Sequence, residues 1–413
     1  MYLSTVDRPR QRLKGAVAAN VLALGTVSLI TDVSSEMVTA ILPVYLVVGL
    51  QLSPAAYGVI DGVYTGSTVL LRLAGGYAAD RIRRRKAVAA AGYGLSAAAK
   101  LGLIAAAGST TGIGVAIAVD RAGKGLRTAP RDALITLSTP PHRLGRAFGV
   151  HRMMDSIGAF AGPLVALAVL SVAGSRSYDA VFVTSFCVAA FGLVVLLLFV
   201  RDHANRLAPR SEPVSPRIAA GLLREPAVRR LTGVACLLGL ATIGDGFVYL
   251  LLQRKAGLSL GWFPLLAVGT SLAYLLLALP IGRLSDRIGR HRVLLIGFLA
   301  LIIGYGVLLA PIPSTVLIVV VPLSLGLFYA ATDGVLMALA GPVLPARLRT
   351  TGLALLQTGQ AVAYLGSSVL FGLAWQSWGA GDAVAIAVAG TLAAGLAAAF
   401  LLRRGVPGPE VVS

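Results

Sequence analysis

The chain has 413 residues, of which 57% are hydrophobic and only 13% are charged, and its formal net charge is +19. A soluble domain carries about 25% charged residues, so the composition excludes an ordinary soluble protein and indicates a membrane protein. A strongly basic chain can also indicate nucleic-acid binding. Here, however, the basic residues lie in short loops between apolar runs, which is the positive-inside pattern, and no nucleic-acid partner is expected.

Apolar runs long enough to cross a bilayer, about 20 residues each, recur twelve times along the chain. They predict an all-α membrane protein with twelve transmembrane helices in two pseudo-symmetric six-helix bundles. The predicted helices cover residues 16–49, 55–79, 87–107, 111–138, 146–172, 178–200, 229–253, 260–282, 292–311, 315–342, 350–372 and 382–402.

Lys and Arg gather in every second loop between these runs. Cytoplasmic loops of membrane proteins carry an excess of Lys and Arg, so both termini are expected in the cytoplasm and the protein in the cytoplasmic membrane. The longest polar stretch predicts a linker between the two halves. The predicted domains are an N-terminal bundle over 1–200, a cytoplasmic linker over 201–228 and a C-terminal bundle over 229–413.

Two short basic signatures match each other and stand once in each half. The early copy runs Gly76-Tyr-Ala-Ala-Asp80-Arg81-Ile-Arg-Arg-Arg-Lys, and the late copy runs Gly282-Arg-Leu-Ser-Asp286-Arg287-Ile-Gly-Arg290-His-Arg. With twelve helices in two halves, the pattern Gly-x-x-x-Asp-Arg-x-Gly-Arg-x-Arg after the second and eighth helices resembles the major facilitator superfamily. The resemblance covers essentially the whole chain, although the early copy has Ala78 and Arg83 where Leu and Gly are usual.

The resemblance implies a gating role for both signatures, because in the family the Asp and Arg are thought to latch neighbouring helices in one conformation. The Asp is expected to cap a helix N-terminus and to pair with an Arg at the cytoplasmic rim. Basic loops that serve only to set the topology are the alternative. The residues assigned to gating are Gly76, Asp80 and Arg81 in the early copy and Gly282, Asp286, Arg287 and Arg290 in the late copy.

The fifth predicted helix contains Gly158-Ala-Phe-Ala-Gly162-Pro163, which resembles the antiporter signature of exporters in the same family. Glycines four residues apart allow two helices to approach closely, and proline adds a bend. The resemblance implies a gating role for Gly158, Gly162 and Pro163, and it favours export over import. Ala166 and Leu167 depart from the signature, which often has Gly-Gly there.

The fourth predicted helix carries the most unusual charges, because a charge at the bilayer centre costs about 2.5–3.5 kcal/mol. Asp120, Lys124, Arg127 and Arg131 follow the spacing of one helical face. Arg121 resembles the Arg of the helix 4 motif of family antiporters, which is linked to proton transfer. Lys124 and Arg127 depart from that motif, and they indicate either an anionic substrate that they bind or a denser internal salt-bridge network. Arg131 and Asp132 fit the headgroup region equally well.

The first predicted helix supplies partners for these cations, since Asp32 and Glu36 lie four residues apart on one face. In the resembled fold the first and fourth helices border a central cavity and run antiparallel, which brings the two acids to the depth of Arg121, Lys124 and Arg127. Burial disfavours the charge of a carboxylate and neighbouring cations favour it. We therefore predict that Asp32 and Glu36 carry protons and that Arg121 modulates them, whereas a metal site is not expected.

The second half has fewer charges within its helices. Asp245 and Asp333, in the predicted seventh and tenth helices, are candidates for substrate binding; a structural role is the alternative, because neighbouring glycines let the backbone satisfy a buried Asp. His151 can titrate near neutral pH, but a rim position is the simpler interpretation. Asp61 and Lys100 are assigned no role.

These features predict a secondary active transporter, specifically a proton-coupled antiporter that exports a small molecule by alternating access. Among small molecules they favour an anionic one. The alternative is an uptake or exchange carrier for a phosphorylated or carboxylated metabolite. A membrane scaffold, a sensor or a lipid translocator is the alternative outside transport. No nucleotide-binding or hydrolytic motif appears in the sequence, so neither an enzyme nor a cofactor is predicted, and the expected partners of a monomer are its substrate, protons and the lipid bilayer.

Overall fold

The computed structural model describes residues 18–65, 84–140, 143–202, 221–340, 343–344 and 349–403. Regular secondary structure in these residues is helical throughout, in agreement with the predicted all-α membrane fold. Within them, nine helices are long and apolar enough to cross a membrane. Helices α4 (Thr110–Leu137) and α14 (Arg349–Trp378) are not among the nine. The ionisable residues of α4 and the Thr, Gln and Ser residues of α14 lower their apolar content.

The first group of helices begins with α1 (Ala19–Val44), which continues into one π-helical turn, η1 (Tyr45–Gly49). A helical segment over 54–65 follows. The others are α3 (Arg85–Ala105), α4, α5 (Leu144–Ala173) and α6 (Tyr178–Phe199).

The second group departs from prediction at two helices, each of which is broken near an Asp-Gly pair. The predicted helix 229–253 divides into α8 (Pro226–Ala241) and α9 (Asp245–Ala256), and the predicted helix 315–342 divides into α12 (Ser314–Thr332) and α13 (Val335–Ala340). Gly334 has φ +79°, a conformation that Gly adopts readily. The remaining elements are η3 (Leu260–Trp262), α10 (Pro264–Ile288), α11 (Arg290–Leu309), α14 and α15 (Ala380–Arg403).

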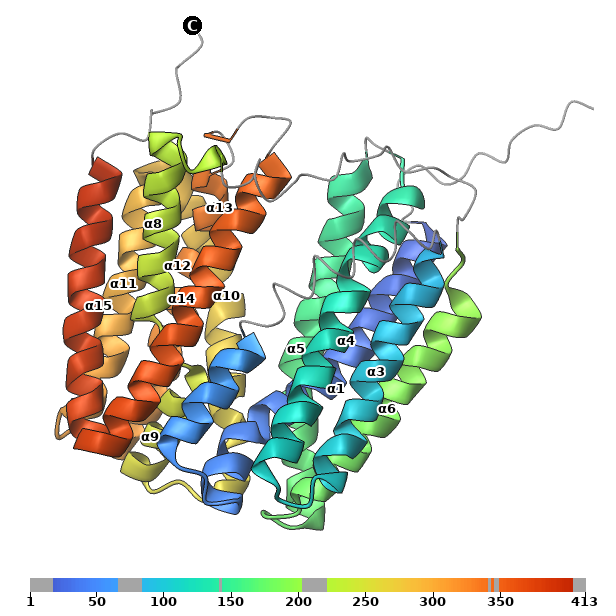
Figure 1. Ribbon diagram of the computed structural model, residues 1–413, viewed down its shortest axis with the longest axis horizontal. Helices are drawn as coiled ribbons and strands as arrows, with labels where there is room; N and C mark the ends of the chain where they lie inside the picture. The colour runs from blue at the N-terminus through green and yellow to red at the C-terminus, as the bar shows by residue number, and fades with distance from the viewer. Residues whose placement is uncertain are drawn as a thin grey trace, which may run out of the picture.

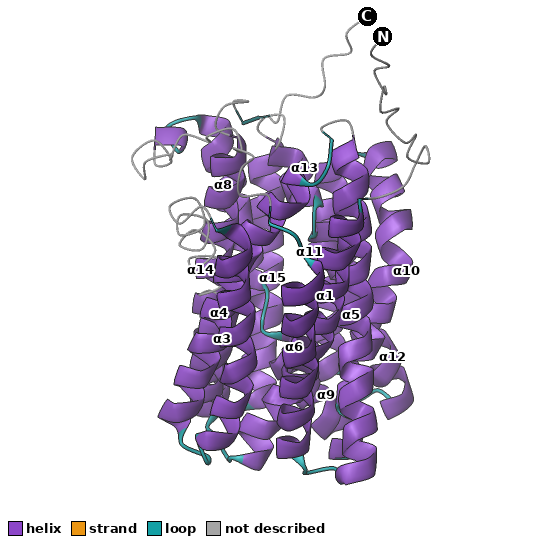
Figure 2. Cartoon of the chain, turned by 90° about the vertical axis from the view of Figure 1, so that its right-hand side faces the viewer, coloured by secondary structure: helices purple, strands orange, loops and turns teal. Residues whose placement is uncertain are grey.

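Figure 1 shows these groups as two bundles, which lie apart at the end where α1 and α8 begin and converge at the opposite end. At the convergent end, segment 54–65 of the first bundle lies beside α14 and α9 of the second. The ring of Tyr57 meets the ring of Phe247 edge-on, with 4.6 Å between centroids. Seen from the side, the helices run roughly parallel to one long axis (Figure 2), as expected for membrane-spanning segments.

Glycine allows the close packing of α5 on α1. A Cβ atom added at Gly162 would lie 2.7 Å from the Cβ of Glu36, and one added at Gly158 would lie 3.1 Å from the Cα of Leu29. Such separations are too short for non-bonded carbon atoms. The exporter-like signature of α5 therefore packs directly on the part of α1 that carries Glu36.

The late basic signature lies on helices, not in the predicted loop. Asp286 and Arg287 are exposed residues in the last turn of α10, and Gly289, with φ +96°, separates α10 from α11. The expectation that Asp286 caps a helix N-terminus is wrong, because Gly289 is the N-cap residue of α11. Arg290 contacts another helix: its guanidinium donates a 2.8 Å hydrogen bond to the Ala338 carbonyl of α13.

Some predicted features cannot be placed in this fold. The early signature residues Gly76, Asp80 and Arg81 lie outside the described residues, as does most of the predicted linker. The linker is predicted to end at residue 228, but α8 already begins at Pro226.

Candidate functional site

A cavity of about 1260 Å³ lies between the two bundles. Helices α1, α4 and α5 and segment 54–65 line it on one side, and α8, α9, α10, α12, α13 and α14 line it on the other. The ionisable side chains of its wall, tyrosines apart, are Asp32, Glu36, Asp61, Lys124, Arg127, Arg131, Asp132, His151, Arg152, Asp155, Asp245 and Asp333. The cavity therefore brings together six of the seven residues predicted for proton coupling and substrate binding.

Asp32 and Arg127 connect α1 to α4 in the cavity wall. The Asp32 carboxylate lies 3.8 Å from the Arg127 guanidinium, and the Arg127 side chain is only 4% exposed. The guanidinium also lies 4.6 Å from the centroid of the Tyr93 ring of α3, which is a cation–π distance. Arg127 thus has partners within the protein, as expected if it belongs to an internal salt-bridge network and does not bind substrate.

Lys124 and Glu36 also line the wall. Lys124 lies one helical turn from Arg127 along α4, and Glu36 lies one turn from Asp32 along α1. Neither side chain forms an ion pair within 4 Å among the described residues, and Lys124 makes no hydrogen bond to them through its ammonium. Lys124 therefore has capacity left to bind an anion, as does the exposed Arg152, and Lys124 is the one that lies beside Arg127 on α4.

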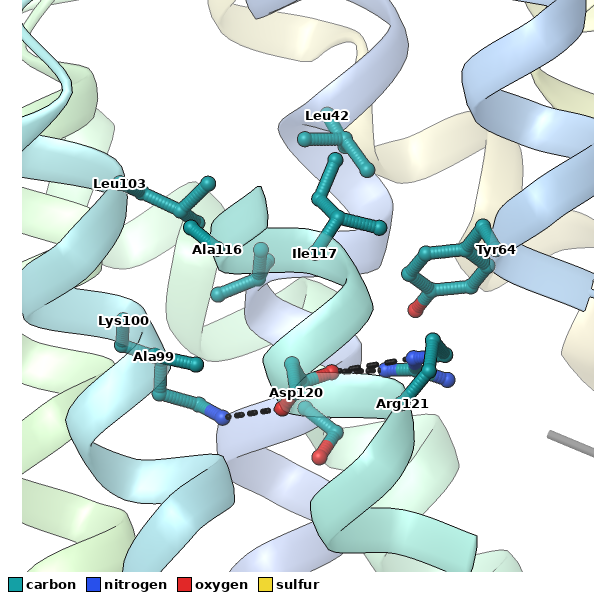
Figure 3. A pocket seen from close by; sticks show the side chains of 11 residues that line it. Leu42, Tyr64, Ala99, Lys100, Leu103, Ala116, Ile117, Asp120 and Arg121 are labelled. Carbon is teal, nitrogen blue, oxygen red and sulfur yellow. Dashed lines mark hydrogen bonds and ion pairs between the residues drawn. The ribbon is translucent and has the colours of Figure 1, made fainter. Parts of the chain in front are cut away.

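Arg121, predicted to modulate Asp32 and Glu36, pairs with its neighbour Asp120, and its side chain is 4% exposed. Its Nε donates a 3.1 Å hydrogen bond to Asp120, and its guanidinium lies 3.8 Å from the Tyr64 ring centroid. Figure 3 shows Asp120 between Arg121 and Lys100, whose ammonium lies 3.3 Å from the same carboxylate. Ser96 donates a further hydrogen bond to Asp120.

Lys100 therefore belongs to a buried charge cluster, which we define as Lys100, Asp120 and Arg121. All three residues of this cluster line a small pocket of about 10 Å³ that is distinct from the large cavity. The sequence placed Asp120 on the same helical face as Lys124 and Arg127, but it carried no signal for Lys100, whose carboxylate partner is 20 residues away on the next helix.

A second polar network connects α1, α4 and α5. The hydroxyl of Ser28 lies 3.0 Å from Nε2 of His151, and Nδ1 of His151 lies 3.4 Å from the Asp155 carboxylate. Arg131 donates a 3.1 Å hydrogen bond to Ser28 and pairs with Asp132. The His151 side chain is buried, lies two turns into α5 and lines the cavity.

The two aspartates of the second bundle lie at the breaks in its helices. Asp245 is the first residue of α9 and accepts a 2.7 Å hydrogen bond from the hydroxyl of Tyr329. Asp333 ends α12 and accepts a 3.3 Å hydrogen bond from Tyr274. A broken helix exposes backbone groups beside a polar cavity, as in transporter binding sites.

Asp61, which was assigned no role, connects the two bundles. Its carboxylate accepts a 3.0 Å hydrogen bond from Tyr364 and another from Ser368, both in α14. These partners lie more than 300 residues away in the sequence, so local spacing carries no signal of them. Segment 54–65, which carries Asp61, lies at the convergent end of the bundles (Figure 1), so these hydrogen bonds join the two bundles there.

We expect Asp61→Leu to open the convergent end more often, because it removes both hydrogen bonds between the bundles. A cysteine introduced at Tyr57, which is 2% exposed where the bundles meet, should react with a bulky maleimide at least about tenfold faster, since each hydrogen bond to a charged group contributes about 1.5–3 kcal/mol. Asp61→Asn, which keeps an acceptor oxygen, is the matched control. Equal labelling rates in all three proteins would contradict the role of Asp61.

Comparison with known proteins supports the architecture. The family model for the Major Facilitator Superfamily matches residues 24–269 and 234–413. An "uncharacterized MFS-type transporter" of Methanocaldococcus jannaschii is 28% identical over 372 residues, which are 87% of this chain and 89% of that protein. An uncharacterized protein of Mycobacterium tuberculosis is 31% identical over 186 residues, 45% of this chain and 44% of that protein.

Solved transporter structures share the fold at low sequence identity. The nucleoside transporter NupG has a TM-score of 0.78 at 16% identity, covering 93% of this chain and 99% of its own. The D-xylose-proton symporter has a TM-score of 0.69 at 18% identity, covering 93% and 96%. With the matched family model, the multi-pass helical fold and the cavity between two bundles, these likenesses lead to one conclusion: the chain belongs to the major facilitator superfamily of membrane transporters.

Proposed function

We propose that the protein is a proton-coupled antiporter that exports a small molecule with an anionic group by alternating access. The observation that carries this proposal is the packing of Gly162 on Glu36, which joins the exporter-like signature to a carboxylate of the cavity wall. A signature helix in contact with a proton-carrying residue couples protonation to helix movement. We further propose the cytoplasmic membrane as its location, two domains over 1–200 and 229–413, and gating by the basic signatures.

The anionic group of the substrate is proposed to bind at Lys124, with Arg127 beside it. Lys124 lines the cavity without an ion pair among the described residues, and Arg127 pairs with Asp32 at 3.8 Å. Two cations about one turn apart suit a carboxylate or phosphate, which a guanidinium can bind through two parallel hydrogen bonds.

The Asp32–Arg127 pair also favours a second candidate, an uptake carrier that moves an organic anion together with a proton. Protonation of Asp32 would release Arg127 to bind the anion, so proton and substrate would favour each other on the same side. In an antiporter the two must instead exclude each other.

The direction of proton movement separates the two candidates. Full-length protein in vesicles with an acidic lumen and a pH-sensitive dye inside is supplied with external substrate. An antiporter releases protons as substrate enters, so the lumen becomes more alkaline; a proton–anion symporter makes it more acidic. A lumen pH that never responds to any organic ion would contradict both.

Single cysteines at positions 84, 210 and 290 test the proposed orientation, on a background in which Cys187 and Cys236 are replaced by Ala. A membrane-impermeant maleimide added outside intact cells should leave all three unlabelled, because basic loops remain in the cytoplasm. A cysteine at exposed Arg176, in the turn between α5 and α6, should be labelled and serves as the control. Strong labelling at any of the three positions would refute the topology.

Neutralising Lys124 should weaken binding of the anion at least about tenfold, because a hydrogen bond between charged groups contributes about 1.5–3 kcal/mol. A double-mutant cycle of Arg127→Gln with Asp32→Asn, read out separately as stability and as affinity, tests whether Arg127 binds substrate or only satisfies Asp32. Regained stability with unaltered affinity in the double variant would make Arg127 structural.

A further inference from the structure

The cations of the large cavity lie on one of its two sides, whereas carboxylates line both. Every Lys, Arg and His among its described lining residues lies on α4 or α5, and the second bundle contributes only the acids Asp245 and Asp333. The second bundle also contributes tyrosines to the wall, among them Tyr249, Tyr329 and Tyr364. One side of the cavity therefore holds all of its cations, together with the carboxylates Asp32, Glu36, Asp61, Asp132 and Asp155. The opposite side has carboxylates and aromatic hydroxyls and no cation among the described residues.

Asp245 is one of the two carboxylates that the second bundle contributes to the cavity wall. Among the described residues it forms no ion pair, and its hydrogen-bond donor is the neutral hydroxyl of Tyr329. A second carboxylate, Asp61, lies in contact with Gly244, the residue before it. The titratable groups that face Asp245 are Asp61, Tyr57, Tyr249, Tyr305, Tyr329 and Tyr364.

None of those neighbouring groups carries positive charge at neutral pH. Taking a carboxylate out of water without a counter-charge is costly, whereas pairing it with a cation offsets the cost. A proton or a cationic ligand can supply the missing charge. The surrounding tyrosine rings also attract ammonium groups through their faces.

We propose that the substrate is a zwitterion whose ammonium group binds at Asp245 while its anionic group binds at Lys124. The assignment of the anion to Lys124 rests on the proposed function; the ammonium site rests on the division of charge in the cavity. A ligand that spans both sides contacts both bundles at once, as alternating access requires.

The ammonium site also gives the exclusion that an antiporter needs. A proton and a substrate ammonium compete for the same Asp245 carboxylate, since a protonated carboxyl no longer attracts a cation. Binding of substrate on the cytoplasmic side thus displaces a proton, and binding of a proton on the opposite side displaces substrate.

Three sets of probes test the proposal on purified full-length protein. They are linear ω-amino carboxylates of increasing chain length, the matching carboxylates without the amine and the matching alkylammonium ions without the carboxylate. Affinity is measured by titration calorimetry and by the rise in unfolding temperature that ligand binding causes. At its best chain length the zwitterion should bind at least about tenfold more tightly than either single-charge analogue.

Two variants assign the ends of the probe. Asp245→Asn should remove the advantage of the zwitterion over the carboxylate and keep carboxylate affinity, and Lys124→Gln should remove its advantage over the alkylammonium ion. Asp179→Asn and Arg176→Gln, both exposed in the turn and first residues of α6 outside the cavity, are the matched controls. The unliganded unfolding temperature of each variant reports whether it folds.

Equal affinity for the zwitterion and one of its single-charge analogues at every chain length, or no binding of any probe, would overturn the proposal. So would an Asp245→Asn protein that folds and keeps the full zwitterion advantage. Failure of the proposed function is a different result: the zwitterion binds with the expected charge dependence, but its transport causes no opposite movement of protons.

Discussion

Replacing Asp32 by Asn is expected to abolish transport driven by a pH gradient while leaving exchange of substrate for substrate in place. Asn cannot take up a proton, so the cycle loses its coupling step. Exchange needs only the movement of loaded protein between its two states. The Asp32–Arg127 pair, 3.8 Å apart, links the proton-carrying group to α4.

Glu36→Gln should have the same effect, because Glu36 lies one turn along α1 and lines the same cavity. Gradient-driven flux into vesicles should fall to the level of protein-free vesicles in both variants, whereas exchange of labelled substrate should stay within about twofold of the unmodified protein. Asp179→Asn, on the exposed first turn of α6, is the control and should keep full driven flux. Full driven flux in both test variants would show that the protons are carried elsewhere.

The sequence predicted the number and positions of helices well because each apolar run is long and is bounded by basic or Gly/Pro-rich loops. It missed the breaks at Thr242–Gly244 and Asp333–Gly334. Glycine stands beside the aspartate at both breaks, in Gly244-Asp245-Gly246 and Asp333-Gly334, but average hydropathy stays high across both. Hydropathy reports burial in lipid and is insensitive to a local change in backbone dihedral angles.

Charges on one helix face were predictable, whereas partners on distant helices were not. Four-residue spacing was enough to bring Asp32 and Glu36 to Lys124 and Arg127, because two antiparallel helices fix their relative depth. Asp61 could not be assigned, since its partners in α14 are set by the packing of one bundle on the other. Tertiary contact of this kind leaves no periodic pattern in a single sequence.

Asp120→Asn is expected to destabilise the protein more than neutralisation of any single charge in the wall of the large cavity. It removes the carboxylate that lies between the ammonium of Lys100 and the guanidinium of Arg121, whose side chains are 3% and 4% exposed. Removing one partner from a buried ion pair costs about 3–5 kcal/mol, because the remaining charge is left without compensation. In this cluster two cations would remain and would repel each other.

The unfolding temperature and the denaturant midpoint of purified Asp120→Asn protein measure this effect. Adding Lys100→Met to Asp120→Asn should recover a substantial part of the loss, because it removes one of the two uncompensated cations and leaves an apolar side chain of similar length. Lys100→Met alone should cost much less, since Asp120 keeps Arg121 and Ser96 as partners. Asp179→Asn, an exposed substitution, should change stability by no more than about 0.5 kcal/mol. If Asp120→Asn matches that control, the buried charge cluster contributes nothing to stability, and the selective value of its charges must be sought in transport.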